Sequence, residues 1–162
     1  MALLFITPLE ITTTTILGGN VDVNKYEFII ESVQISVIEP LLGTELYDKI
    51  VTEVGNATIT GDYLELFTQF VKPITKYEAL AEYVEVGSLM VSNGGIFKNT
   101  PENAETASGT EVQNLADKYH GLGELYANRF EKWIGLKNIP EYKTAQDEVN
   151  AQDINTRTGW HL

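Results

Sequence analysis

The 162-residue sequence contains no cysteine. Disulfides, thiolate metal sites and cysteine nucleophiles are therefore excluded. A chain of this length buries about 70% of its extended-chain surface on folding, so it needs no covalent crosslink. The absence of cysteine fits a protein of a reducing compartment, and the length predicts a single domain.

Basic residues are scarce: 11 Lys and Arg stand against 23 Asp and Glu, for a net charge of −12. Residues 1–70 hold ten acidic and only two basic residues. Tight duplex binding requires several cations that neutralise phosphates, and no basic stripe is present. An acidic surface would instead let DNA pass without adhering. Simple solubility is the plainer explanation of the same charge.

Long apolar runs are also missing. The first residues, "MALLFITPLEI", lack a basic stretch before their apolar run, and Pro8 interrupts that run. This argues against a signal peptide. No run approaches the roughly 20 apolar residues of a membrane-spanning helix. We therefore expect a soluble protein that is made in the cytoplasm and has no membrane partner.

The common catalytic patterns do not occur. The two histidines, His120 and His161, belong to no HxxxH or ExxH pattern, which leaves a metal site unsupported. There is no GxSxG, and "SNGGIFKN" lacks the GK[ST] ending of a phosphate-binding loop. The sequence predicts no enzyme, no cofactor and no metal.

One acidic cluster requires separate treatment. Glu78, Glu82 and Glu85 lie at i, i+4 and i+7, which places them on one helix face. Three neighbouring carboxylates could bind a cation or raise each other's pKa. The plainer interpretation is a solvated acidic face. A hydrolase that uses this cluster is the remaining alternative and would require Glu82.

Apolar residues recur at helical spacing over most of the chain, which predicts a mainly α fold. We expect a bundle of about four to five helices with extended arms at both termini. One long helix starts after Asp62, is kinked at Pro73 and ends between residues 85 and 90. The last helix runs from about 110 to 134. Asn93 and Gly94 predict the turn of a small β-hairpin near 88–98.

The stretch "IEPLLGTELYDKI" (38–50) predicts a corner between two helices. Pro40 ends the first helix near Glu39, because the residue before proline avoids the α region. Gly43 can adopt a positive φ, and Thr44 is a good N-cap for a helix over 45–54.

The sequence predicts an extended arm at each end of the chain. The β-branched run of threonines at 12–15 favours an extended segment. Residues 135–162 lose the helical periodicity and finish near Trp160 and Leu162. We predict a helical domain over 1–134 and an arm over 135–162 that docks through these two residues. Simple fraying of the C-terminus is the alternative.

Several segments together resemble a known family. They are "ITPLEI", residues 17–50 with the corner, "VKPITKYEALAEY", "VSNGGIF" and "ENAETAS". Over roughly residues 4–134 the chain resembles small helical head–tail connector proteins of tailed bacteriophages, a family common in phages of Bacteroidetes hosts.

Gly121 and Gly123 of the last helix permit either a close backbone crossing or a slight bend.

The resemblance implies a structural virion protein, a head-completion adaptor at the head–tail junction. Such adaptors form a homo-oligomeric ring, usually of twelve subunits, below the portal protein and next to a tail or stopper protein. They bind the portal through an extended terminal segment, and DNA passes through them as cargo. Under this hypothesis Glu78, Glu82 and Glu85 line the lumen, while Trp160, Leu162, Asn93 and Gly94 form interfaces. The alternative is a monomeric acidic helical module that binds or inhibits basic partners.

Overall fold

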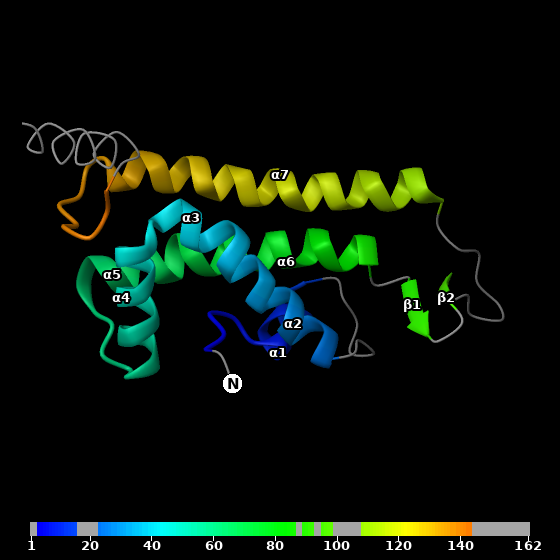
Figure 1. The fold of residues 1–162 in the computed structure, drawn as a ribbon. Coiled ribbons are helices and arrows are strands. Elements are labelled where there is room, and N and C mark those ends of the chain that lie inside the picture. The colour runs from blue at the N-terminus through cyan, green and yellow to red at the C-terminus, as the bar shows by residue number, and fades with distance from the viewer. Residues whose placement is uncertain (1–2, 16–22, 87–88, 93–94, 99–107, 144–162) are drawn as a thin grey trace, which may run out of the picture.

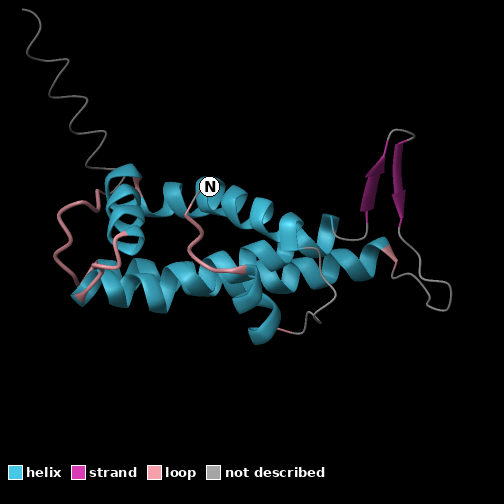
Figure 2. Ribbon diagram, turned by 90° about the horizontal axis from the view of Figure 1, so that it is seen from below, coloured by secondary structure: helices cyan, strands magenta, loops and turns pink. Residues whose placement is uncertain are grey.

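The computed structural model describes residues 3–15, 23–86, 89–92, 95–98 and 108–143, and it is mainly helical (Figure 1). Apart from two short strands, the described elements are helical (Figure 2). In chain order they are α1 (Pro8–Thr14), α2 (Val23–Val33), η1 (Gln34–Ile38), α3 (Glu39–Leu42), α4 (Thr44–Gly55), α5 (Gly61–Leu66), η2 (Phe67–Val71), α6 (Lys72–Val86), β1 (Leu89–Ser92), β2 (Gly95–Lys98) and α7 (Gly109–Ile134).

The threonine-rich N-terminal segment is helical, so the prediction of an extended arm at 12–15 is wrong. Thr7 and Glu10 form a capping box that starts α1, and Pro8 occupies the first turn, where its missing N–H costs nothing. The Thr13 and Thr14 hydroxyls donate to carbonyl oxygens four residues earlier, at 2.8 and 2.6 Å. These bonds give the threonine hydroxyls hydrogen-bond partners within the helix.

Pro40 does not end the helix that begins with α2, so the prediction that this helix ends near Glu39 is wrong. α2 continues through the π-helical turn η1 into α3 and ends only at Leu42. In this turn the Glu39 N–H donates to the Gln34 carbonyl, five residues back. A proline ring collides with the carbonyl four residues back in a regular α-helix. The wider π turn placed directly before Pro40 relieves that conflict.

The same arrangement recurs at Pro73. The π-helical turn η2 joins α5 to α6, and the Lys72 N–H donates to the Phe67 carbonyl. The helix is therefore continuous from residue 61 to residue 86, as the sequence predicts. In both helices the proline follows the last π-turn residue by two positions.

The corner between the helices lies at Gly43 alone. Gly43 has φ 76° and ψ 150°, a conformation that a residue with a side chain rarely adopts. It also occupies the N-cap position of α4, so the prediction that Thr44 is the cap is wrong. Thr44 is the first helical residue, and its hydroxyl donates to Glu39 Oε1 at 3.3 Å.

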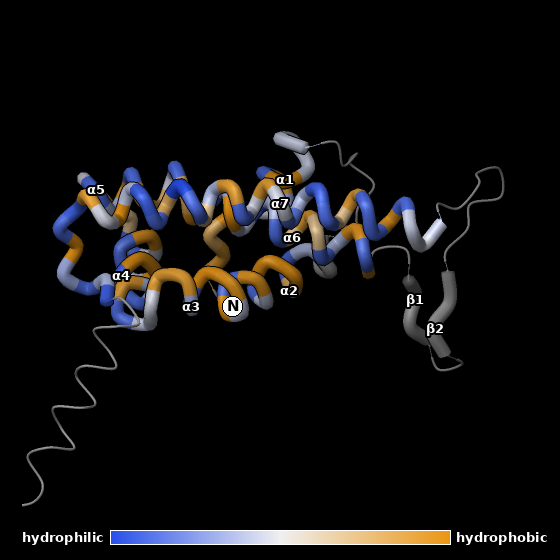
Figure 3. Tube along the Cα trace, turned by 90° about the horizontal axis from the view of Figure 1, so that it is seen from above, coloured by the Kyte–Doolittle hydropathy of each residue, from blue (hydrophilic) through white to orange (hydrophobic). Residues whose placement is uncertain are grey.

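Helix α6 lies between two layers of helix. It packs against α7 along much of its length and against α2 on another side (Figures 1 and 3). Two apolar clusters fill the spaces. One surrounds α4, η2 and the end of α7, and it includes Phe5, Leu46 and Phe130. The other joins α1, α2 and α6 around Ile11 and Tyr26.

Gln34 fastens the N-terminal segment to this body. The helical spacing places Gln34 off the apolar stripe, but its side chain is 2% exposed. Its Oε1 accepts from the Phe5 N–H at 2.7 Å, and its Nε2 donates to the Leu3 carbonyl at 2.9 Å. One buried side-chain amide thus provides hydrogen-bond partners for two backbone groups of residues 3–5, which belong to no helix or strand.

The last helix begins at a second capping box, made by Ser108 and Glu111, and its bounds agree closely with the predicted 110–134. Residues 135–143, which the sequence assigns to the C-terminal arm, pack back on the body. Ile139 is buried, and the Tyr142 ring meets Phe130 edge-on at 5.6 Å. Lys137 pairs with Asp62 at 2.7 Å.

Strands β1 and β2 pair antiparallel, with Leu89 opposite Lys98 and Ser92 opposite Gly95. The turn residues Asn93 and Gly94 lie outside the described residues, and so do Trp160 and Leu162. No helix in the described part of the chain is long and apolar enough to cross a membrane.

Candidate functional site

The predicted acidic cluster lies in a groove between α6 and α7, where it meets the only histidine of the described chain. Glu78, Glu82 and Glu85 line it from α6, and Asp117 and His120 line it from α7. The three glutamates do not share one environment. Glu78 is buried, Glu82 is half-buried and Glu85 is exposed. The expected solvated face is therefore correct for Glu85 and wrong for Glu78.

Glu78 is buried because α7 offers it both a partner and space. His120 Nδ1 lies 2.7 Å from Glu78 Oε2, and the Glu78 side chain is only 10% exposed. Gly123 lies one turn further along α7, and its missing side chain leaves the space that the carboxylate occupies. A Cβ at Gly123 would lie 2.1 Å from Glu78 Oε1. The close approach that the sequence allowed at Gly123 is thus made by a side chain, whereas Gly121 has open space around it.

The charges of the groove act on one another. The hydrogen bond to Glu78 and its negative charge raise the pKa of His120, and Glu124 and Asp117 add to this effect. Burial raises the pKa of Glu82, and the neighbouring charges of Glu78 and Glu85 raise it further. A buried carboxylate needs a cation or hydrogen-bond donors close by, and protonated His120 supplies both.

We expect His120 to titrate above its ordinary pKa of about 6.5. Its pKa is higher in the folded than in the unfolded chain. The pair therefore contributes its full stability below about pH 6.5, and that contribution is lost as the pH rises through the folded-state pKa. NMR titration of the ring should show that Glu78→Gln returns the pKa of His120 toward its ordinary value.

Glu124→Gln is the matched control for this titration. Glu124 Oε1 lies 3.7 Å from the other ring nitrogen of His120, and both side chains are largely exposed there. Its removal should lower the pKa of His120 less than Glu78→Gln does. An unchanged pKa in Glu78→Gln would contradict the pairing.

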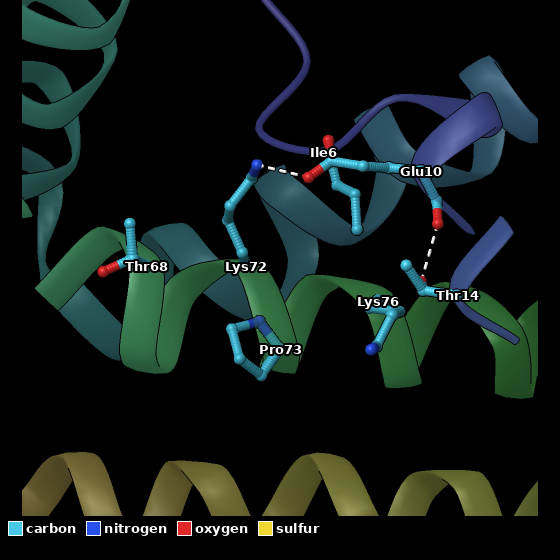
Figure 4. A pocket seen from close by; sticks show the side chains of 7 residues that line it. All are labelled: Ile6, Glu10, Thr14, Thr68, Lys72, Pro73 and Lys76. Carbon is cyan, nitrogen blue, oxygen red and sulfur yellow. Dashed lines mark hydrogen bonds and ion pairs between the residues drawn. The ribbon is translucent and has the colours of Figure 1, made fainter. Parts of the chain in front are cut away.

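A second hollow lies between α1 and α6 (Figure 4). Lys72 reaches across it to Glu10 Oε1, with 2.5 Å between Nζ and the oxygen, and Lys76 and Pro73 lie along the same side of α6. The Lys72 side chain, mainly through its hydrogen bond, lowers the pKa of Glu10 against the opposing effect of burial. This partly exposed ion pair joins α1 to α6, while the burial of Ile6 and Ile11 in the cluster with α2 and α6 holds the N-terminal helix on the body.

The predicted corner forms a third shallow hollow. Ile35, Glu39 and Pro40 line it together with Gly43 and Thr44. Pro40, Gly43 and Thr44 are thus brought together as the sequence predicts, although the turn itself is made by Gly43. His120 was missed as a partner of the glutamates because 42 residues separate it from Glu78. No local signal connects the two positions.

The fold and the groove together define a mainly helical protein with a partly buried Glu–His pair between its two longest contacting helices. No group of three or more histidines and carboxylates in the described chain is placed to hold a metal ion. The model of a family of unknown function, DUF6712, matches residues 38–150, which is more than half of the sequence. The chain belongs to this family. No curated protein and no solved structure matches it significantly.

Proposed function

We propose that the protein is a structural virion subunit, one of a ring of copies that joins the phage head to the tail below the portal. The observation that carries the proposal is the resemblance over residues 4–134, whose most characteristic stretch is the corner segment 38–50. The match to DUF6712 begins at the same corner, at residue 38. The role is one of assembly, with no catalytic step and no cofactor.

The arrangement of the helices supports this proposal. A ring subunit needs a rigid body with two different faces, because head-to-tail contacts close only when each copy offers both. Two long helices interrupted by π turns at Pro40 and Pro73, and a corner fixed by Gly43, give a body of that kind. Portal and tail or stopper proteins are the proposed partners on either side, and twelve copies are the expected number.

The charge also supports a passage for DNA. The chain carries 23 acids against 11 bases, and the groove between α6 and α7 is lined by carboxylates on both sides. We place the exposed Glu85 and Asp117 and the half-buried Glu82 toward the lumen. Glu78 no longer belongs to that lining, because its carboxylate is buried against α7. Negative walls repel the phosphate backbone and prevent it from adhering.

Replacing Glu85 and Asp117 by lysine should slow DNA ejection from assembled particles and leave ring assembly intact. Two exposed cations at the lumen would attract the phosphates that the carboxylates repel. Ejection from purified particles can be followed by the release of DNA after triggering, at several salt concentrations. The slowing should shrink as salt rises.

Asp48→Lys is the charge-matched control, because Asp48 is an exposed acid on α4 away from the groove. Each single lysine variant, Glu85→Lys and Asp117→Lys, is compared with it at equal particle number. Ejection from the double variant at the wild-type rate would refute the lumen assignment.

Cryo-electron microscopy of the virion neck tests the function itself. A ring of this chain directly below the portal is the expected result. The alternative, a monomeric acidic module, predicts no density there and a monomeric mass in solution both with and without portal protein. Particles that lack the chain at the neck would overturn the proposal.

A further inference from the structure

The outward side of α7 carries an apolar and basic stripe that no part of the described chain covers. Leu125 is 52% exposed and Leu115 is 37% exposed. They lie on one side of the helix with Leu122 and with three cations at matching three- and four-residue steps: Lys118, Arg129 and Lys132. The buried residues of α7, such as Ala116, Gly123 and Phe130, face the opposite way.

The cations of this stripe have no carboxylate to pair with on their own helix. The positions three and four residues away from Lys118, Arg129 and Lys132 hold no Asp or Glu. Beyond the first turn of α7, where Glu111 belongs to the capping box, the acids lie on another flank, at Asp117, Glu124 and Glu131. None of the ion pairs between described residues includes any of the three cations. In a chain of net charge −12, this local excess of positive charge is unusual.

The outward side of α2 and η1 carries the complementary pattern. Phe28 is 72% exposed and Ile35 is 57% exposed. Glu31 is exposed between them, and Glu27 is half-buried beside them. Residues 26–48 contain no Lys or Arg at all, and no ion pair between described residues includes Glu27 or Glu31.

This acidic face also has a recess at its end. Ile35 lines the shallow hollow at the Gly43 corner, together with Glu39 and Pro40. An apolar side chain that projects from a facing helix would fit beside Ile35 there, as in the packing of ridges into grooves. The exposed leucines of the α7 stripe are side chains of this kind.

We propose that the α7 stripe of one copy packs on the α2–η1 face of the next copy. Apolar side chains would meet at the centre, with lysine and arginine opposite glutamate around them, as expected of a protein interface. The two faces belong to different helices of one molecule and both point outward, so they can satisfy each other only between molecules. Because the faces differ, the contact is head-to-tail, which generates a ring when the rotation closes.

Cysteine crosslinking tests this interface without background, because the chain has no native cysteine. Phe28→Cys and Leu125→Cys are combined in the full chain, and the purified protein is treated with a short bismaleimide. We expect a ladder of dimers, trimers and larger species. Either single variant alone should give little or no crosslinked product, because in a head-to-tail contact its cysteine faces a native side chain of the next copy.

Leu9→Cys with Leu125→Cys is the matched control, since Leu9 is 71% exposed but lies on α1. It should give no ladder. A Phe28→Cys/Leu125→Cys protein that stays monomeric, or that gives no more ladder than this control, overturns the inference.

Charge reversal provides the second measurement. Lys118→Glu with Lys132→Glu, added to the crosslinking variant, should reduce the ladder about tenfold at low salt, because like charges would then face each other. Adding Glu27→Lys with Glu31→Lys to the same chain should restore it. A ladder that is indifferent to both changes would refute the charge pairing and with it the proposed register.

The inference deepens the proposed connector function and rests on it only for the closure of the ring, so the two can fail separately. A ladder from a protein that is absent from the virion neck would keep the interface and refute the function. A neck protein whose double-cysteine variant gives no ladder, in solution or in particles, would keep the function and refute the interface.

Discussion

Phe5→Ala should lower the free energy of unfolding by about 3–5 kcal/mol, the range for removing a fully buried aromatic side chain. Phe5 is 2% exposed, and its ring meets Tyr47 and Phe67 edge-on at 5.5 and 5.6 Å. It joins the N-terminal segment to the cluster around α4 and η2. Denaturant unfolding, followed by far-ultraviolet circular dichroism, measures the change from the shift in midpoint at constant slope.

Leu9→Ala is the control, because Leu9 lies in the same segment but is 71% exposed. It should change stability by no more than about 0.5 kcal/mol. If residues 3–15 formed a free arm, both substitutions would leave stability unchanged. Equal midpoints for Phe5→Ala and the wild type would therefore restore the arm that the threonine run predicts.

This result bears on how a connector would reach its neighbours. The resemblance implies a terminal segment that binds the portal, and the sequence offers both ends as candidates. Phe5, Gln34 and the Glu10–Lys72 ion pair fasten residues 3–15 to the body. Residues 135–143 are held by Ile139 and by the Lys137 ion pairs. The described residues at both ends are therefore packed on the body, and neither 3–15 nor 135–143 forms a free arm.

Helical periodicity predicts what depends on nearest neighbours. The sequence predicts the apolar stripe of α7, the apolar side of α4 and the continuity of the helix through Pro73, because each follows from spacing along one helix. Pro40 carries the same local signal as Pro73, yet the prediction of a helix end there is wrong. In both helices a π turn lies just before the proline and lets the helix continue. The local sequence does not reveal the extra residue of such a turn, so the outcome at Pro40 could not be predicted.

Contacts between distant segments could not be read in this way. Gln34 looks like a solvent-facing residue at helical spacing, yet it binds the backbone of residues 3 and 5. Glu78 looks like one member of an acidic face, yet it is buried against His120. In both cases the partner lies about 30 to 40 residues away along the chain. Tertiary packing decides such positions, and local propensity does not record it.

Gly123→Ala should destabilise the protein, whereas Gly121→Ala should stabilise it, although the two glycines are only two residues apart on α7. A Cβ at Gly121 has no atom within 4 Å, so alanine there gains about 1 kcal/mol of helix propensity. A Cβ at Gly123 would lie 2.1 Å from Glu78 Oε1 and 2.9 Å from Cδ. The Glu78 side chain must then leave its position or α7 must move away from α6. Either change should cost about 1–3 kcal/mol beyond the propensity gain.

Stability measurements on the two alanine variants should therefore differ by about 2–4 kcal/mol. The pKa of His120 supplies a second measurement, because a displaced Glu78 can no longer raise it through the 2.7 Å hydrogen bond. In Gly123→Ala the pKa of His120 should fall toward its ordinary value, and in Gly121→Ala it should not move. Glu78→Ala removes the clashing carboxylate, so Gly123→Ala added to that background should become stabilising like Gly121→Ala. If Gly123→Ala destabilises the Glu78→Ala variant as much as it destabilises the wild type, the glycine accommodates something other than this carboxylate.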